Sequence, residues 1–216
     1  MDNFGDLLLR VDPMELDRFP NYTEQNPLKV LVSACLAGDL CGVDGTSNGE
    51  CSWILKLIRK NNVHAVKFCP EHFFMGTPRD LPDIHGGNGF DVLDGKARVL
   101  TDKGEDCTSG MVRAAHHMLE IARQEKIDLA ILMDMSAACG SQVISDGCRL
   151  VPDRKYQKGP GVCAALLMRE HIPVISQRDY RSLELLYKKL DTSHKLNPKA
   201  IDHHETDWYR SYFSHT

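Results

Sequence analysis

The stretch "VLVSACLAGDLCGVDG", residues 30–45, sets the fold that we expect for this chain. An apolar run leads directly to Cys35, and a second cysteine, Cys41, comes shortly before Asp44. Residues 28–34, "LKVLVSA", have the pattern of a short strand that is buried on both faces, as strands of parallel sheets are. This first strand therefore ends at a thiol, and turn residues follow it.

Outward from this strand, the chain alternates between strands and helices. We predict strands at 28–34, 64–69, 128–134 and 172–176, and helices at 51–61, at 108–125 and after the glycine turn at 159–161. This alternation is typical of a parallel sheet covered by helices. We expect a single three-layer, Rossmann-like α/β domain with a mainly parallel sheet, short hairpins and a C-terminal helical extension.

The connecting segments are predicted from turn chemistry. Residues 70–89 hold four glycines and three prolines and are expected to be mostly loop. Residues 90–100 and 141–151 each contain an Asp-Gly pair, which predicts two hairpins. Thr108 is the expected N-cap of the helix at 108–125.

The chain divides into three parts. Residues 28–177 form the expected core, and residues 1–27 are an N-terminal extension. Residues 178–216 form a tail with a helical stripe of leucines and an aromatic end, "DWYRSYF". We expect this tail to pack on the core or on a second subunit.

Composition limits the possible functions. The 216 residues are 42% hydrophobic and carry a net charge of -4. They contain no lysine or arginine block, so a nucleic-acid polymer is not an expected partner. No apolar run reaches the roughly 18 residues needed to span a membrane, and the N-terminus lacks the basic flank of a signal peptide. We expect a cytoplasmic protein, monomer or homodimer, that binds a small molecule.

Eight cysteines are many for such a chain, and none forms a CxxC pair. This absence argues against a zinc ribbon, a thioredoxin-type site and a ferredoxin-type loop. Three cysteines instead lie at or just after strand ends: Cys35, Cys69 and Cys139. Because the carboxyl ends of parallel strands lie along one edge of a sheet, we expect these thiols to converge there.

Several kinds of chemistry suit three converging thiols. They can bind a [4Fe-4S] cluster with one iron left open, or zinc with water as a fourth ligand. They can also be buried fillers or carry out thiol redox chemistry. We interpret most of the other cysteines as core filling, namely Cys51, Cys107, Cys148 and Cys163. Cys41 is a possible redox partner, because it lies in the loop after Cys35.

A group of motifs extends over residues 28–177. They are "SACLAG", "FCPEH", "TPR", "DVLDGKARVL", "DCTSGMVRAA", "SAACGS" and "GPGVCAALL". In order and spacing, they resemble the DUF523 family, whose characterised members are 2-thiouracil desulfurases. The resemblance implies a Rossmann-like domain and a [4Fe-4S] cluster bound by Cys35, Cys69 and Cys139. It also implies non-redox removal of sulfur from a thiolated pyrimidine, with the substrate sulfur on the free iron.

Further residues are candidates for catalysis and substrate binding. Glu71 is expected to activate water or to protonate the ring, as the family motif also indicates, and its alternative is a helix cap or a salt bridge. Ser136 is expected to orient the substrate or to relay a proton, and its alternative is a backbone cap. The tentative substrate-binding residues are Ser33, Asp44, Arg79 and Gly161. For each of these four residues, a purely structural role is the alternative.

Two other functions remain open from the sequence. In the "SAACG" motif, Ala137 and Ala138 stand where the DUF523 family has proline and serine. This change and the aromatic tail are compatible with a non-catalytic iron–sulfur or metal-binding protein that acts in redox sensing or partner binding. A zinc hydrolase with the same three thiols is the second alternative.

Overall fold

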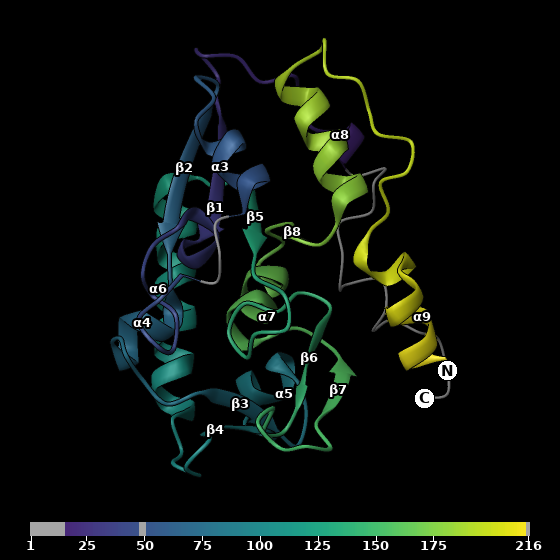
Figure 1. The fold of residues 1–216 in the computed structure, drawn as a ribbon. Helices are drawn as coiled ribbons and strands as arrows, with labels where there is room; N and C mark the ends of the chain where they lie inside the picture. The colour runs from purple at the N-terminus through teal and green to yellow at the C-terminus, as the bar shows by residue number, and fades with distance from the viewer. Residues whose placement is uncertain (1–15, 48–50, 215–216) are drawn as a thin grey trace.

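A computed structural model describes residues 16–47 and 51–214 (Figure 1). Its centre is a four-stranded sheet with the strand order β2-β1-β5-β8, in which every neighbouring pair is parallel. These strands are β1 (Leu28–Ser33), β2 (Val63–Phe68), β5 (Leu129–Leu132) and β8 (Val174–Ser176). The predicted mixed α/β fold with a mainly parallel sheet is therefore confirmed. Residues 1–15, most of the predicted N-terminal extension, lie outside the described part of the chain.

The sheet is buried on both faces because its strands alternate between two apolar clusters. Leu31 of β1 and Leu132 of β5 point to one cluster, while Val30 of β1 and Ile131 of β5 point to the other. The first cluster includes α6 (Thr108–Glu125) and α7 (Val162–Arg169), and the second includes α3 (Ser52–Ile58) and α8 (Tyr180–Leu190). The result is three layers, with helices on both sides of the sheet.

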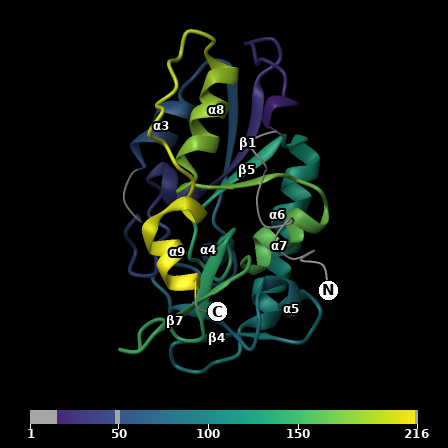
Figure 2. The same cartoon turned by 90° about the vertical axis from the view of Figure 1, so that its right-hand side faces the viewer.

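The C-terminal tail continues along one side of the molecule, where α8 and α9 (Asp207–Phe213) follow each other (Figures 1 and 2). Leu183, Leu186 and Leu190 of α8 belong to the second cluster. Between the two helices lies the short 3₁₀ helix η2 (His203–Glu205). None of the described helices combines the length and the apolar character that crossing a bilayer requires. The compartment stays a prediction.

Residues 70–89 contain more regular structure than we predicted. They form α4 (Pro70–Met75) and β3 (Pro82–His85). Helix α4 begins after Cys69, whose Sγ accepts a hydrogen bond from the backbone N–H of His72 at 3.4 Å. Proline at the first helical position has a φ angle suited to a helix start, so Pro70 begins a helix here.

The predicted hairpin at 90–100 is wrong. Residues Gly89–Leu93 form α5, and β4 (Arg98–Thr101) pairs antiparallel with β3 instead. The helix starts in a capping box, in which Asn88 accepts from the N–H of Phe90 and Asp91 accepts from the N–H of Asn88. Capping satisfies N–H groups that a helix start otherwise leaves open, and this favours a helix over a strand.

The second predicted hairpin is displaced. Strand β6 (Val143–Asp146) pairs with β7 (Lys155–Lys158) rather than turning back at Asp146-Gly147. The loop between β6 and β7 contacts β3, because the side chain of Arg149 donates two hydrogen bonds to Asp83 of β3, at 2.6 and 2.8 Å. Thr108 was also predicted wrongly as an N-cap. Cys107 has that position, and the Thr108 hydroxyl accepts from the N–H of Val99.

Candidate functional site

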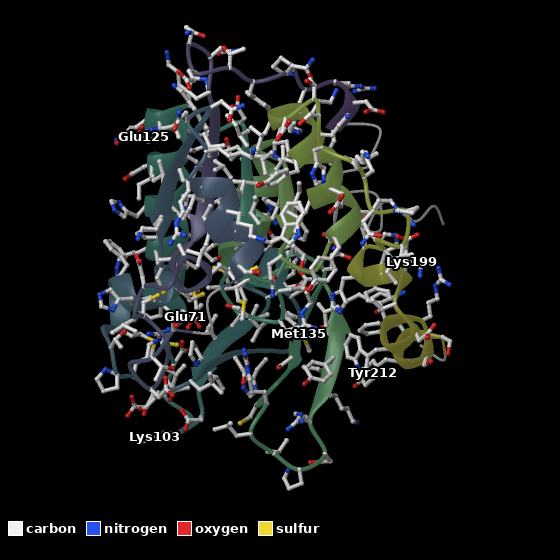
Figure 3. The ribbon with its side chains drawn as sticks, turned by 45° about the horizontal axis from the view of Figure 1, so that its top comes forward. Glu71, Lys103, Glu125, Met135, Lys199 and Tyr212 are labelled. Atoms are coloured by element: carbon white, nitrogen blue, oxygen red, sulfur yellow. The ribbon has the colours of Figure 1, made fainter. Side chains whose placement is uncertain are left out.

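A cavity of about 520 Å³ opens where β1, β2 and β5 end. Three cysteines line it: Cys35 in the 3₁₀ helix η1 (Ala34–Ala37) after β1, Cys69 after β2, and Cys139 in the loop after β5. A parallel sheet places its strand ends along one edge, so residues far apart in sequence meet here. Glu71 and Met135, both labelled in Figure 3, line the same cavity.

A fourth thiol, that of Cys41, also lines the cavity and is buried. It hydrogen-bonds to Cys35 and to Cys69, and these contacts raise the pKa of Cys41 far above its usual value. The hydrogen bond with Cys41 lowers the pKa of Cys69 to about 7, although burial opposes this shift. The hydrogen bond from the N–H of His72 also lowers the pKa of Cys69. The thiol of Cys69 also lies 3.7 Å from the carbonyl oxygen of Cys41.

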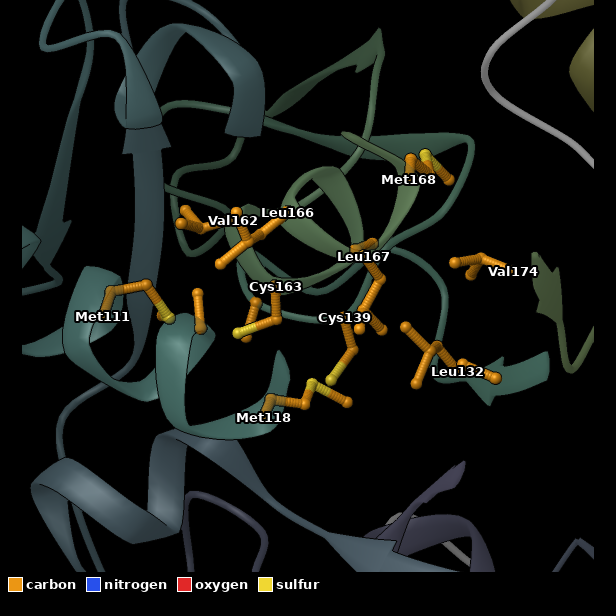
Figure 4. Packing of buried hydrophobic residues seen from close by; sticks show 14 of the residues in the cluster. Met111, Met118, Leu132, Cys139, Val162, Cys163, Leu166, Leu167, Met168 and Val174 are labelled. Atoms are coloured by element: carbon orange, nitrogen blue, oxygen red, sulfur yellow. The ribbon is translucent and has the colours of Figure 1, made fainter. Parts of the chain in front are cut away.

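Cys139 lies between the cavity and the core. It is 5% exposed, lines the cavity, and belongs to the apolar cluster in which Figure 4 shows it with Cys163. Burial, followed by the nearby Cys163, raises the pKa of Cys139 well above its usual value, and a hydrogen bond from Ser33 acts in the opposite direction. Ligation by a metal would remove the thiol proton, since the thiolate is the ligand.

The spacing of the three thiols bears on the kind of metal centre. Tetrahedral zinc with Zn–S bonds of about 2.3 Å holds its sulfurs about 3.8 Å apart. Within the described part of the chain, one three-ligand group has all donor atoms within 4.8 Å of one another, and that group is Asp179, Asp202 and His204. At least two of the sulfurs of Cys35, Cys69 and Cys139 are therefore more than 4.8 Å apart in the described structure.

Beside the thiols, Glu71 is held by two donors. Its Oε2 lies 2.7 Å from Nη2 of Arg79, and its Oε1 accepts from the Ser136 hydroxyl at 3.1 Å. The Ser136 oxygen in turn accepts from the N–H groups of Ala138 and Cys139. The two residues proposed for catalysis therefore contact each other directly, and Ser136 also holds the turn that carries Cys139.

Arg79 is buried and bound on several sides. Its Nη1 donates to the carbonyl oxygens of Cys41, Gly42 and Gly76, at 2.9, 3.3 and 3.2 Å. Its side chain is 3% exposed. These contacts join the loop after Cys35 to the loop after α4. Arg79 also lines the cavity, so substrate binding by this residue stays a prediction.

The other tentative substrate-binding residues differ in position. Ser33 lines the cavity, and its hydroxyl accepts from the N–H of Met133 at 3.0 Å. Asp44 lines the outer part of the cavity and closes a turn by accepting from the N–H and hydroxyl of Thr46. Gly161 is not part of the cavity lining. A Cβ atom on Gly161 would lie 2.6 Å from the carbonyl oxygen of Ala137, so glycine allows close packing behind the Cys139 loop.

Sequence reasoning missed Asp134. This residue follows β5, lines the cavity, and is 3% exposed. Its carboxylate accepts from the N–H groups of Ser141, Gln142 and Val143. An acidic residue directly after a buried strand could have indicated a site residue. The predicted strand at 128–134 included Asp134, whereas β5 ends at Leu132.

The chain is similar to known proteins in both sequence and structure. A sequence profile of the family described as 2-thiouracil desulfurase matches residues 30–179. An uncharacterised protein, YbbK of Bacillus subtilis (strain 168), is 36% identical over 155 residues, which are 71% of this chain and 99% of YbbK. A solved structure described as a [4Fe-4S]-dependent thiouracil desulfidase, TudS, is 33% identical and superposes with a TM-score of 0.56. It covers 69% of this chain and 90% of its own.

Proposed function

Because this chain belongs to the 2-thiouracil desulfurase family, we propose that it is a [4Fe-4S]-dependent desulfurase of a small thiolated heterocycle, such as a thiouracil-like nucleobase. The observation that carries the proposal is the lining of one cavity by Cys35, Cys69 and Cys139 together with Glu71 and Ser136. The description of TudS as a [4Fe-4S]-dependent thiouracil desulfidase supports it.

Cys35, Cys69 and Cys139 are the proposed cluster ligands, because their thiols come from three strand ends and face the same space. When bound, a [4Fe-4S] cluster with three cysteine ligands supplies one iron that is open to the substrate sulfur and acts as a Lewis acid. Cys35 and Cys139 are only 8% and 5% exposed, so the surrounding residues shield this part of the cavity from water. Shielding strengthens electrostatic interactions inside the cavity.

The proposed reaction replaces sulfur by oxygen without net oxidation. One water molecule forms a C–O bond to the substrate carbon, the C–S bond breaks, and sulfide leaves with the protons that water supplied. Glu71 accepts a proton from the attacking water or delivers one to the ring, as a positioned general acid–base group does. Its Oε2 is held by Arg79, so Oε1 and the Ser136 hydroxyl are the atoms available for proton movement.

The experiment that tests this function is anaerobic reconstitution with iron and sulfide, followed by incubation with 2-thiouracil. We expect a brown protein that releases sulfide and forms uracil in equal amounts. Replacement of any of the three thiols, in Cys35→Ser, Cys69→Ser and Cys139→Ser, should abolish both the colour and the activity. Cys148→Ser is the matched control, because Cys148 is not part of the cavity lining and should leave both unchanged.

The same experiment separates the alternatives. A loaded protein that releases no sulfide from thiolated bases would support a non-catalytic iron–sulfur protein. Zinc in place of iron after purification without air would support the hydrolase alternative. Colour and iron retained in all three serine variants would contradict the ligand assignment.

A further inference from the structure

The tail reaches the proposed site from outside the family match. The match ends at residue 179, and the 3₁₀ helix η2 begins at His203. His203 is 2% exposed, and its Nδ1 lies 2.6 Å from Oδ2 of Asp134, which lines the cavity. A residue of the C-terminal extension therefore contacts the cavity wall through one buried hydrogen bond.

Asp134 organises the loop that carries Ser136 and Cys139. Its Oδ1 accepts from the N–H groups of Ser141, Gln142 and Val143 at 3.1, 3.3 and 3.4 Å. These donors begin two residues after Cys139, so the carboxylate of Asp134 binds the backbone at the far end of the loop. Although burial opposes ionisation, the hydrogen bond and charge of His203 lower the pKa of Asp134.

A second link joins the tail to the same loop. Asp179 accepts from the backbone N–H of His203 at 3.0 Å and from the side-chain amide of Gln142 at 2.8 and 2.7 Å. His203 is thus connected to the loop through Asp134 and, by way of Asp179, through Gln142. The carboxylates of Asp134 and Asp179 are both buried, and breaking a buried hydrogen bond to a charged group costs more free energy than breaking one between neutral groups.

The ring of His203 is held in place by aromatic packing. It stacks on Trp208 of α9 with a centroid distance of 5.5 Å and an interplanar angle of 9°. Trp208 and Tyr212 of the same helix contact Tyr156 of β7. The aromatic end of the tail therefore fixes the orientation of the imidazole toward Asp134.

From these contacts we infer that His203 is a positioning residue for the desulfurase site, and that it acts through Asp134 on the loop carrying Ser136 and Cys139. This inference rests on the proposed function for its link to catalysis. The effect of His203 on the loop itself does not depend on that function. The C-terminal extension is then a functional part of the site.

Three variants test the inference. His203→Phe keeps a stacking ring and removes the donor to Asp134. His203→Asn places an amide N–H near the position of Nδ1 and should restore the contact. His203→Gln, similar in size and polarity to asparagine, places its amide beyond that position and is the second loss variant if the phenylalanine variant does not fold.

His194→Phe is the matched control. His194 also lies in the tail, pairs with a carboxylate, Glu184, at 2.9 Å, and contacts the rings of Trp53 and Tyr187. In the described part of the chain, these side-chain contacts of His194 do not reach the loop between Asp134 and Val143. A general effect of losing a tail histidine would therefore appear in this variant as well.

Amide hydrogen exchange is the first measurement, because it needs neither the cluster nor a substrate. We expect the amides of residues 141–143 to exchange about tenfold faster in His203→Phe and His203→Gln, as loss of a charged hydrogen-bond network allows. In the loaded enzyme we expect kcat to fall about tenfold with little change in KM, because a displaced loop misplaces catalytic groups. His203→Asn should keep wild-type values in both measurements.

The outcomes are distinct. Wild-type exchange at residues 141–143 in both loss variants, or equal acceleration in His194→Phe, would overturn the inference. Faster exchange in the loss variants without any sulfide release by the wild-type protein would support the effect on the loop and overturn the proposed function alone.

Discussion

At the scale of single residues, the two carboxylate oxygens of Glu71 have different partners. Oε2 is bound to the buried guanidinium of Arg79, whereas Oε1 contacts the Ser136 hydroxyl. A carboxylate held in this way is oriented by one partner and can exchange protons through the other. The two predictions at this scale separate these functions.

Glu71→Gln should abolish proton transfer and leave the cluster in place. The amide keeps hydrogen-bonding atoms near Arg79 and Ser136 but cannot accept a proton at neutral pH. We expect sulfide release to fall about 10²- to 10⁴-fold, the range for removal of a general acid–base group, with unchanged iron and sulfide content. Glu120→Gln, on the exposed face of α6, is the control. Activity within twofold of wild type would contradict this role.

Arg79→Met should destabilise the fold. It leaves the partly buried Glu71 without its cation and removes three bonds to loop carbonyls. Breaking a buried pair from one side lowers the free energy of unfolding by about 3–5 kcal/mol. Arg123→Met removes a pair with Glu170 on the surface and should lower it by less than about 1 kcal/mol. Urea unfolding measures both, and equal losses would contradict the prediction.

At the scale of elements, the strands and long helices of the core agree with local pattern. The helix predicted at 108–125 matches α6, and the strands predicted at 28–34 and 64–69 match β1 and β2 within one residue at each end. The short elements do not follow local pattern alone. The Asp94-Gly95 pair indicates a hairpin turn, but the capping box at Asn88 makes the preceding residues helical. Short segments are decided by a few side-chain contacts, whereas long amphipathic ones are decided by periodicity.

Helix α8 gives a prediction at this scale through Asp179, its N-cap residue. Burial, followed by the charge of Asp202, raises the pKa of Asp179 to about 6. The folded protein therefore binds this proton more tightly than the unfolded chain does. The contribution of Asp179 to stability falls as pH rises from about 4 to about 6.

Asp179→Asn removes this titration and leaves the neighbouring Asp202 and His204 in place. From about pH 4 to about pH 7, we expect the stability of the variant relative to wild type to rise by up to about 3 kcal/mol. Urea unfolding at both pH values measures this change. A difference between the two proteins that does not change with pH would contradict the raised pKa.

At the scale of the whole molecule, the tail covers one face of the sheet. Leu183 and Leu186 are fully buried against a cluster that includes Leu129, Ile131 and Ile175. A chain that ends at residue 179, where the family match ends, would expose this apolar face to water. We propose that residues 178–216 are part of the folded unit. Whether the protein is a monomer or a homodimer stays a prediction.

A chain that ends at residue 179 should bind a hydrophobic dye such as anilinonaphthalene sulfonate and should lose cooperative urea unfolding. The reason is that the second apolar cluster lacks the leucines of α8 in this chain. Leu186→Ala in the full chain is a graded version of the same test. It should lower the free energy of unfolding by about 2–5 kcal/mol. Cooperative unfolding of the truncated chain at the wild-type midpoint would contradict the prediction.

The α/β class, the parallel sheet and the long elements could be predicted from the amino-acid sequence, because periodicity and turn residues act over a few neighbouring positions. The sequence also placed Cys35, Cys69 and Cys139 at or after strand ends, and parallel topology predicts their meeting at one edge. Their roles as ligands stay predictions. The family motifs added the expected cofactor and substrate class.

The contacts that hold the site together could not be predicted from the sequence and are seen in the folded chain. The bonds of Arg79 to the Cys41 loop and of His203 to Asp134 join residues 38 and 69 positions apart. The buried position of Cys139 between cavity and core likewise depends on how α6 and α7 pack. Such contacts leave no periodic pattern in the sequence, because each depends on a single pair of side chains that the folded backbone brings within hydrogen-bond distance.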